Sequence, residues 1–455
     1  MSHVTYIQQG DANDSALRTG YQRHLDLETK NWLEQDARYF LHQALSTPVM
    51  NVLQRAEGPY IYDLLGKKYL DLHGNGVHNI GFNNPYVVDA IKRQLDEGLS
   101  FTPRRFTNQV AVEFAQKLVE LAPTGLDRVL LCPGGAEAIE MAVLLAKQVT
   151  GKWKTISYWD NYHGTTWQAA SIGGTEHFNT GYGPMVPGAF HVEFPNYYRN
   201  PWGLTDKTQI DDLYLRQIET VVQRNPDIAA IIGTTVTSTP VVPTAYYWER
   251  VQDICRRHDA FLIFDEIICG LGRTGQVFAC EDYVTPDIVV LGKSLGGGII
   301  PLAGIVTKEE YNSLSNRSIG HFTHEKNPLT CAAGLATLQY IENHNLAKHA
   351  AELGGYLLQQ LMALQNRFSL IGHIEGKGML IAIDLVTNRE TKERAFAPAQ
   401  AIMYRCLENG VSFKLIDGNV LALSPALTIN RQEADFIIDV IEEAFAYYVI
   451  NDSSI

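Results

Sequence analysis

The sequence predicts an α/β fold, with a mostly parallel central sheet covered by helices on both faces and a smaller α+β domain beside it. Two observations predict the sheet. The middle of the chain alternates short runs rich in β-branched residues with helical patterns, and these runs are apolar throughout. A third observation predicts the second domain: the chain has 455 residues, which is more than one small core requires.

Six apolar runs are the expected strands of the sheet. They are Arg128–Cys132, Lys154–Trp159, Ala229–Val236, Ala260–Asp265, Asp287–Gly292 and Leu302–Thr307. Helical patterns lie between them, such as AEAIEMAVLLAKQVTG, which Gly151 closes, and TAYYWERVQDICRRH, which ends before Asp259. In such sheets the ligand lies beyond the carboxyl ends of the strands, so functional residues are expected there.

The two ends of the chain predict the smaller domain. YIYDLLGKKYLDLHG (60–74) is typical of a hairpin with Gly66 and Lys67 at its turn. After about residue 333, two long helical patterns flank short strands such as GMLIAIDLV. We therefore expect an N-terminal segment (1–75) that packs with the small domain, a large domain (76–333) and a C-terminal small α+β domain (334–455).

The composition excludes several classes of function. The net charge of −13 disfavours nucleic acid and anionic membrane surfaces as partners. The six cysteines are scattered, without a CxxC pair or the spacing of a metal site, which predicts reduced thiols and no metal. The polar start and the lack of an apolar run of about 18 residues predict a cytoplasmic protein.

The segment PDIVVLGKSLGGG (286–298) places a lysine where a buried strand should end. A phosphate-binding loop would need glycine at the position of Asp287, so that interpretation fails. A partly desolvated lysine has a lowered pKa and becomes nucleophilic, which makes Lys293 a candidate for imine formation. The alternative is a lysine that extends its ammonium to the surface.

Two further segments favour the imine. FLIFDEIICG places Asp265 at a strand end, where a protonated pyridine nitrogen would neutralise its carboxylate. The alternatives are a helix N-cap or a salt bridge to Arg273. CPGGAEAIE joins a strand to a helix through Gly135 and Ala136, whose backbone N–H groups could hold a phosphate. A plain tight turn is the alternative there.

Together these segments resemble the class III (ornithine/ω-amino acid) aminotransferases, a family of fold-type I pyridoxal-phosphate enzymes. The resemblance runs from about Tyr60 to the C-terminus, and DEIICGLGRTG and PDIVVLGKSLGGG are its most specific parts. It implies pyridoxal 5'-phosphate as cofactor, a small-molecule amine as substrate and a homodimer with the active site at the interface.

The resemblance also implies roles for individual residues. Lys293 would form the imine and act as the catalytic base, and Asp265 would pair with the pyridine nitrogen. The cofactor contacts would be Ile267 under the ring, Tyr162 on its other face, Gly135 and Ala136 at the phosphate, and Thr323, which would reach the phosphate of the neighbouring subunit.

The sequence departs from the family at two places. Many members carry an EP-x-Q-G segment after a central strand, where this chain has GTTVTSTP (233–240). Many also have an arginine that clamps the carboxylate of the keto acid, and this position corresponds to Ala422 in NVLALSPALTI. Without the clamp, a β-elimination that needs no keto acid becomes the favoured reaction. The alternative is that another arginine replaces the clamp.

The segments GNGVHNIGFNNP (74–85) and TPRRFTN (102–108) are most similar to family members that remove ammonia from amino-alcohol phosphonates. This resemblance implies elimination from (1R)-1-hydroxy-2-aminoethylphosphonate to give phosphonoacetaldehyde and ammonia, a step of phosphonate catabolism. Candidate substrate contacts are Arg104, Arg105, His163 and Lys326. The alternative functions are an ω-aminotransferase and a catalytically silent binding protein. For the arginines, the alternative is solvated or surface-paired side chains.

Overall fold

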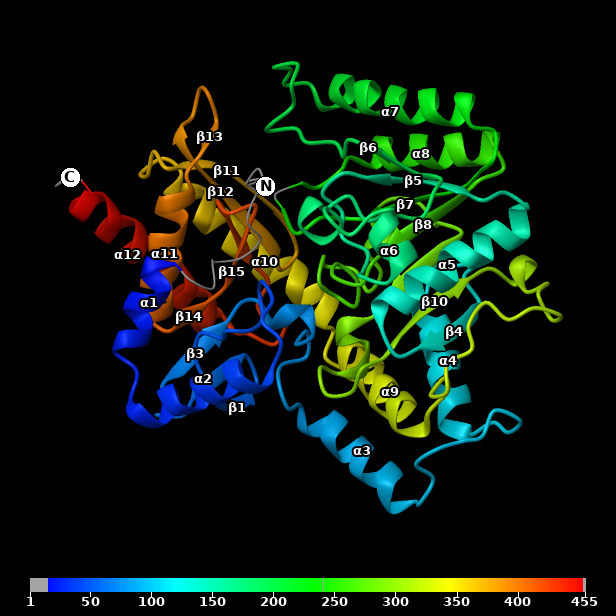
Figure 1. Ribbon diagram of the computed structural model, residues 1–455, viewed down its shortest axis with the longest axis horizontal. Coiled ribbons are helices and arrows are strands. Elements are labelled where there is room, and N and C mark those ends of the chain that lie inside the picture. Colours follow the sequence, from blue (N-terminus) through cyan, green and yellow to red (C-terminus); the bar gives the residue numbers. More distant parts are fainter. Residues whose placement is uncertain (1–14, 240, 453–455) are drawn as a thin grey trace. The chain divides into compact units, whose positions relative to one another are not determined.

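The computed structural model describes residues 15–239 and 241–452, and the chain divides into two compact units. The large unit comprises residues 84–237 and 241–350, and the small unit comprises the described parts of residues 1–83, 238–240 and 351–455. Figure 1 shows the course of the chain through both units. No described helix combines the length and apolar character that a membrane span requires.

A seven-stranded sheet forms the centre of the large unit, in the order β4-β10-β9-β8-β7-β5-β6. Along the sheet, the strands β6, β5, β7, β8 and β9 are parallel to one another. Strand β10 is antiparallel to both of its neighbours, β4 and β9. This confirms the mostly parallel sheet and the six predicted strands; β6 was not predicted. The strands are β4 (Arg128–Cys132), β5 (Lys154–Tyr158), β6 (Ala189–Val192), β7 (Ile228–Thr234), β8 (Phe261–Asp265), β9 (Ile288–Leu291) and β10 (Ala303–Thr307).

Helices cover both faces of this sheet. Gly134 precedes α5, and Gly151 closes it in the left-handed conformation with a φ of 69°, as its position after the helical pattern predicts. The Thr244 side chain caps α8 by accepting a hydrogen bond from the Tyr247 N–H. The helices of the large unit are α3 (Pro85–Asp96), α4 (Gln109–Leu121), α5 (Gly135–Thr150), α6 (Trp167–Ile172), α7 (Lys207–Arg224), α8 (Ala245–Arg257) and α9 (Pro328–Asn343).

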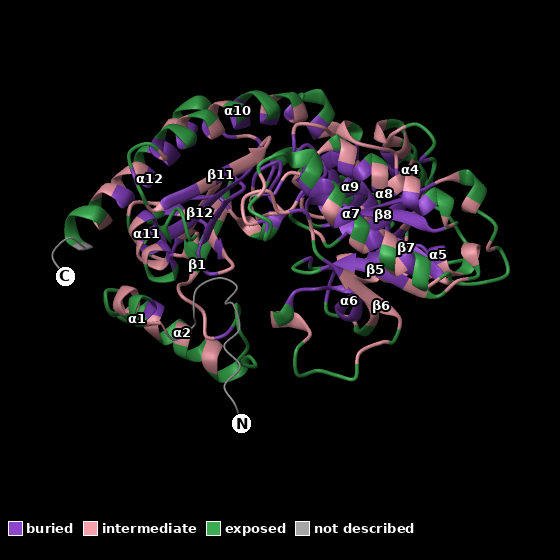
Figure 2. Ribbon diagram, turned by 90° about the horizontal axis from the view of Figure 1, so that it is seen from above, coloured by how far each residue is buried: buried purple, intermediate pink, exposed green. Residues whose placement is uncertain are grey.

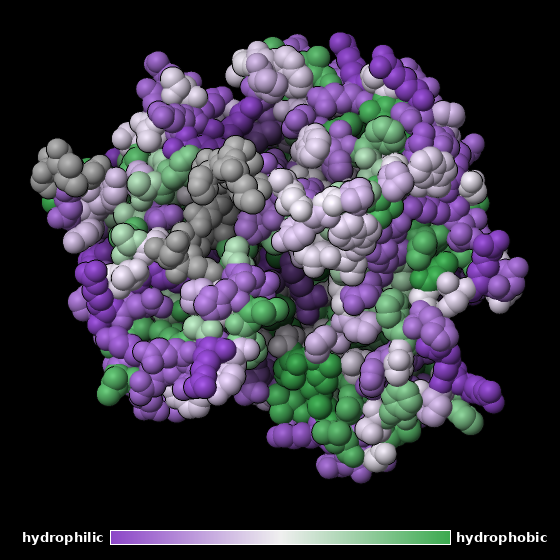
Figure 3. Space-filling view, in the orientation of Figure 1, coloured by the Kyte–Doolittle hydropathy of each residue, from purple (hydrophilic) through white to green (hydrophobic). Residues whose placement is uncertain are grey.

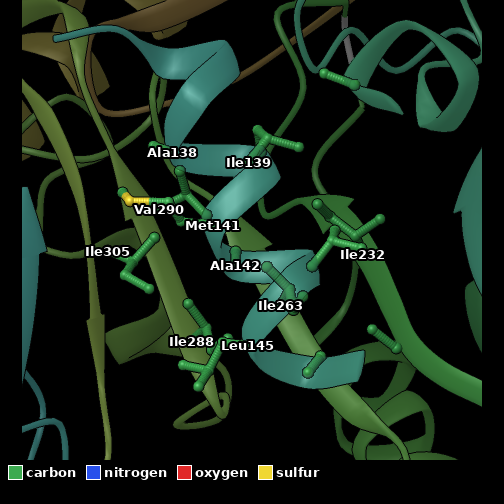
Figure 4. Packing of buried hydrophobic residues seen from close by; sticks show 14 of the residues in the cluster. Ala138, Ile139, Met141, Ala142, Leu145, Ile232, Ile263, Ile288, Val290 and Ile305 are labelled. Carbon is green, nitrogen blue, oxygen red and sulfur yellow. The ribbon is translucent and has the colours of Figure 1, made fainter. Parts of the chain in front are cut away.

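The core of the large unit lies between α5 and the sheet. Figure 4 shows α5 side chains such as Met141 and Leu145 packed against Ile263 of β8 and Val290 of β9. The next residue of β8, Phe264, points to the opposite face and contacts Trp248 of α8, with ring centroids 4.7 Å apart. Both faces of the strands are thus buried, which explains their continuous apolar runs.

The small unit contains two sheets. One has the order β1-β2-β3-β14 and includes the predicted hairpin, with Gly66 and Lys67 between β2 and β3. The other has the order β11-β12-β16-β15, with β13 paired to β12. The strands are β1 (Leu53–Glu57), β2 (Tyr60–Asp63), β3 (Lys68–Asp71), β11 (Ile371–Lys377), β12 (Leu380–Asn388), β13 (Glu393–Arg394), β14 (Val411–Ser412), β15 (Lys414–Ile416) and β16 (Val420–Leu423).

Helices α1 (Ala16–Arg23), α2 (Leu27–Tyr39), α11 (Phe396–Glu408) and α12 (Arg431–Asp452) belong to the small unit, and α10 (Leu346–Leu364) begins in the large unit and continues into the small one. Figure 2 shows that purple, buried segments concentrate in the strands, whereas the helices carry exposed green faces. Hydrophilic side chains colour much of the face visible in Figure 3, with apolar patches between them.

Candidate active site

Two neighbouring strands bring Lys293 and Asp265 to the same edge of the sheet. Asp265 is the last residue of β8, and Lys293 follows β9 after one glycine. The strands are parallel, with Asp265 paired to Val290. Lys293 is exposed and has a φ of 45°, in the left-handed region. This conformation costs a non-glycine residue about 1–3 kcal/mol, and such strain is typical of functional sites.

A buried histidine holds the carboxylate of Asp265. The His163 Nδ1 lies 2.7 Å from Asp265 Oδ2, and neither residue is more than 4% exposed. Because a carboxylate only accepts, Nδ1 carries the proton and donates it. The other carboxylate oxygen accepts a hydrogen bond of 3.1 Å from the Ile267 N–H. The His163 Nε2 is buried and has no hydrogen-bond partner in the described part of the chain.

The N-terminus of α5 forms a cradle of small residues. A Cβ on Gly135 would lie 2.8 Å from Ile267 Cδ1, so a larger residue would displace the end of this side chain. A Cβ on Gly164, whose φ is 125°, would lie 2.5 Å from the Cβ of Ala136. No side chain caps the helix at Gly134. The first N–H groups of α5 are therefore available to an anion such as a phosphate.

Tyr162 lies beside this cradle in the loop that also carries His163 and Gly164. Its side chain is 47% exposed, and its ring contacts Phe178 with centroids 4.6 Å apart. Partial burial raises the pKa of its hydroxyl, and the nearby Asp265 charge adds to the rise. A half-exposed aromatic ring next to the strand ends can stack on a flat ligand.

Glu266 stabilises the loop that follows β8 through hydrogen bonds. It is fully buried and accepts hydrogen bonds of 2.7 Å from the N–H groups of Ala279 and Cys280 and one of 3.2 Å from the Thr235 hydroxyl. Burial raises the pKa of the Glu266 carboxyl to about 7. Arg273 is also fully buried, and desolvation lowers its pKa to about 9. Sequence reasoning did not single out Glu266.

The other candidate residues lie on a different segment of the large unit. Arg104 donates a hydrogen bond of 3.0 Å to the Phe322 carbonyl, and its Nε lies 3.8 Å from a carboxylate oxygen of Glu325. These contacts connect the loop of Arg104 to the segment that contains Thr323. Arg105, Thr323 and Lys326 are exposed. His163, by contrast, is buried and hydrogen-bonded to Asp265.

These residues fit pyridoxal phosphate. The cradle suits its phosphate, the buried carboxylate suits its pyridine nitrogen, and the strand-end lysine suits its aldehyde. A family model described as "Aminotransferase class-III" matches residues 42–445. The chain belongs to the class-III aminotransferase family. As a member of this family it is a pyridoxal-phosphate-dependent enzyme.

Named relatives of this class-III chain catalyse different reactions. It is 40% identical to the (R)-1-hydroxy-2-aminoethylphosphonate ammonia-lyase of Vibrio splendidus, over 97% of this chain and 95% of that protein. It is 32% identical to a leucine/methionine racemase of Thermococcus litoralis, over 91% of this chain and 95% of that protein. Family membership therefore fixes the cofactor but leaves the reaction open.

Solved structures of class-III enzymes share the fold. A pyridoxal-phosphate-bound amine transaminase from an uncultivated Pseudomonas species has a TM-score of 0.85 and 31% identity, with 90% of this chain and 98% of that chain covered. An ω-transaminase from Pseudomonas jessenii has a TM-score of 0.86 and 30% identity, with coverages of 90% and 96%. The fold-type I assignment is confirmed.

Replacing His163 tests its role as the positioning residue of Asp265. We expect His163→Phe to lower kcat by about 10-fold and the free energy of unfolding by about 1–3 kcal/mol, because Asp265 loses a buried donor. Urea unfolding and steady-state kinetics measure the two effects. His163→Asn is the matched control, since its amide places a donor near the position of Nδ1. Equal losses in both variants would contradict the role.

Proposed function

We propose that this class-III enzyme is an ammonia-lyase that converts (R)-1-hydroxy-2-aminoethylphosphonate to phosphonoacetaldehyde and ammonia. The similarity to the Vibrio splendidus ammonia-lyase over nearly the whole of both chains carries this proposal. The intact cofactor residues and the missing carboxylate clamp support it. The absence of a keto-acid requirement distinguishes this reaction from transamination.

Pyridoxal phosphate bound here supplies an electron sink that acidifies the carbon next to the amine nitrogen. The proposal assigns the covalent attachment of the cofactor to Lys293 and the ring-nitrogen contact to Asp265. Gly135 and Ala136 would hold the phosphate through backbone N–H groups at the start of α5. Ile267 and Tyr162 would lie on the two faces of the ring.

Lys293 also moves the proton. Its Nζ, once free, accepts the proton from the carbon that bears nitrogen, and the hydroxyl on the neighbouring carbon leaves as water after protonation. The released enamine takes up one water and yields the aldehyde and ammonia. The elimination releases one water and the hydrolysis of the enamine consumes one, so the overall reaction needs no co-substrate. In the proposal, the Asp265 carboxylate would stabilise a positive charge on the ring nitrogen.

The proposal takes Ala422 as the position at which many family members carry the arginine that binds a keto acid. Ala422, the corresponding position, lies in β16 and is 7% exposed. The segment GTTVTSTP in the sequence begins with Gly233 and Thr234, the last two residues of the buried strand β7, and contains no carboxylate. An arginine binds a planar carboxylate through two parallel hydrogen bonds, which alanine cannot replace. The second half-reaction of a transaminase is therefore disfavoured.

Turnover without a keto acid is the decisive measurement. We expect the enzyme, given the hydroxyaminoethylphosphonate alone, to release ammonia and aldehyde in equal amounts over many turnovers. Dehydrogenase-coupled assays quantify both products. A single turnover that stops until pyruvate or 2-oxoglutarate is added would contradict the proposal and support an ω-aminotransferase, like the similar enzyme from Pseudomonas jessenii.

The proposal includes a homodimer in which the Thr323 hydroxyl reaches the cofactor phosphate of the neighbouring subunit. Thr323 is exposed on the large unit, next to the loop that Arg104 ties down. Its exposure leaves its hydroxyl accessible to a second chain. Arg104, Arg105 and Lys326, on the same surface, remain candidate contacts for an anionic substrate.

A further inference from the structure

The half-exposed ring of Tyr162 is in contact with a second aromatic ring. Phe178 ends a short 3₁₀ helix (Glu176–Phe178) in the loop that connects α6 to β6. The two ring centroids lie 4.6 Å apart, and the ring planes form an angle of 56°. Tilted rings at such a distance attract each other. The pair thus joins the loop after β5 to the loop after α6.

Both loops are attached to the carboxyl edge of the sheet. The Gly174 N–H donates a hydrogen bond of 2.9 Å to the Asn161 carbonyl, which links the two loops directly. The Asn161 side chain is buried and accepts a hydrogen bond of 3.0 Å from the N–H of Thr234, the last residue of β7. Asp265 ends the parallel neighbour β8, so the aromatic pair lies at the edge that carries the candidate active site.

The approach of the second loop to the sheet requires glycine. A Cβ on Gly174 would overlap the carbonyl oxygen of Tyr158, the last residue of β5. Because this neighbour is backbone in a central strand, it has no freedom to move aside. The position of the loop that carries Phe178 is therefore specified by the sequence.

Contacts within its own loop hold Phe178 in place. The Phe178 N–H donates a hydrogen bond of 3.0 Å to the Thr175 carbonyl, and the Asn179 side chain donates one of 3.0 Å to the Gly173 carbonyl. The His177 ring packs edge-on against the Phe178 ring, with centroids 4.8 Å apart. Phe178 thus presents a fixed apolar surface to the more exposed Tyr162.

We propose that Phe178 is a positioning residue, which holds the Tyr162 ring in the orientation that stacks on the cofactor. The inference rests on the proposed function only in the place that this function gives to Tyr162, and not on the choice between elimination and transamination. A half-exposed ring without support loses conformational freedom when a ligand orders it. Phe178 therefore raises the affinity for pyridoxal phosphate by orienting the ring beforehand.

Phe178→Leu tests this role, because leucine remains apolar but removes the ring. We expect the dissociation constant of pyridoxal phosphate to rise about 3- to 10-fold, which is the strength of one aromatic pair. Titration of the cofactor-free protein measures it. The visible circular dichroism of the bound cofactor should weaken, since Tyr162 is less ordered. We expect kcat at saturating cofactor to change less than about twofold, because Phe178 does not touch the reacting atoms.

Two further variants separate positioning from packing. Phe178→Tyr keeps the ring and should restore both the dissociation constant and the circular dichroism. Phe178→Met is a second variant without a ring and should behave like Phe178→Leu. Tyr182→Leu is the matched control, because Tyr182 belongs to the same loop and is 62% exposed. It should bind the cofactor as the unsubstituted protein does.

A double-mutant cycle shows whether Phe178 acts through Tyr162. Tyr162→Ala removes the ring that Phe178 supports and should itself weaken cofactor binding. In this background Phe178→Leu should cause no further loss, because coupled residues give non-additive effects. A loss that persists in full in the Tyr162→Ala background would show that Phe178 acts independently.

Three outcomes would overturn the inference: unchanged cofactor binding in both Phe178→Leu and Phe178→Met, an equal loss in Phe178→Tyr, or additive effects in the cycle. A Tyr162→Ala variant with unchanged affinity would refute the place of Tyr162 in the proposed function, and the inference with it. If the enzyme requires a keto acid, only the proposed reaction fails, because the cofactor titration involves no substrate.

Discussion

Lys293→Ala is expected to reduce turnover by at least about 10⁴-fold, because the proposed mechanism assigns to this one residue both the covalent attachment of the cofactor and the transfer of the proton. The structure supports so large an effect. Lys293 lies at the carboxyl edge of the sheet, in a left-handed conformation next to Gly292, and the neighbouring strand ends at Asp265. Product formation in a sensitive ammonia assay measures the loss.

Absorption spectroscopy separates this effect from unfolding. The visible band of the lysine-bound cofactor should vanish in Lys293→Ala, while the urea midpoint stays within about 1 kcal/mol of the unsubstituted enzyme, because the side chain is exposed. Lys207→Ala, at the exposed start of α7, is the control and should retain activity. Substantial turnover by Lys293→Ala would remove the mechanism.

Asp265→Asn reduces kcat by about 10³-fold, because the amide cannot stabilise a positive charge on the ring nitrogen. The substitution removes the charge and one of the two hydrogen bonds that the carboxylate accepts, because an amide has a single acceptor oxygen. The His163 Nδ1 donates to Asp265 Oδ2 over 2.7 Å, and the amide oxygen of asparagine can accept the same hydrogen bond. Because the hydrogen bond from His163 can be kept, the fold around β8 and the proposed phosphate site at the start of α5 should remain largely intact.

Cofactor content and kinetics together check the Asp265 prediction. The variant should retain bound pyridoxal phosphate and lose kcat, whereas Asp212→Asn on the exposed side of α7 should retain both. A loss of kcat smaller than about tenfold would show that the carboxylate charge contributes little to the reaction. Loss of the cofactor instead would make Asp265 a determinant of binding.

Local sequence patterns were sufficient to place Asp265 and Lys293 at the ends of two strands. The apolar runs before Asp265 and Lys293 predicted buried strands, and both residues follow them as expected. The turn at Gly66 and the helix end at Gly151 were predicted from glycine positions alone. β6 was missed because its four residues, AFHV, carry too short an apolar pattern.

The amino-acid sequence by itself determined six strands of the large sheet and the turns at Gly66 and Gly151, because these follow from periodicity and local backbone preference. Only the tertiary structure decided that His163 donates to Asp265, 102 residues away, and that Phe178 packs on Tyr162. Both contacts depend on which strands and loops become neighbours and in which register. The neighbours and the register are set by the packing of the whole core, and a local sequence pattern carries no information about that packing.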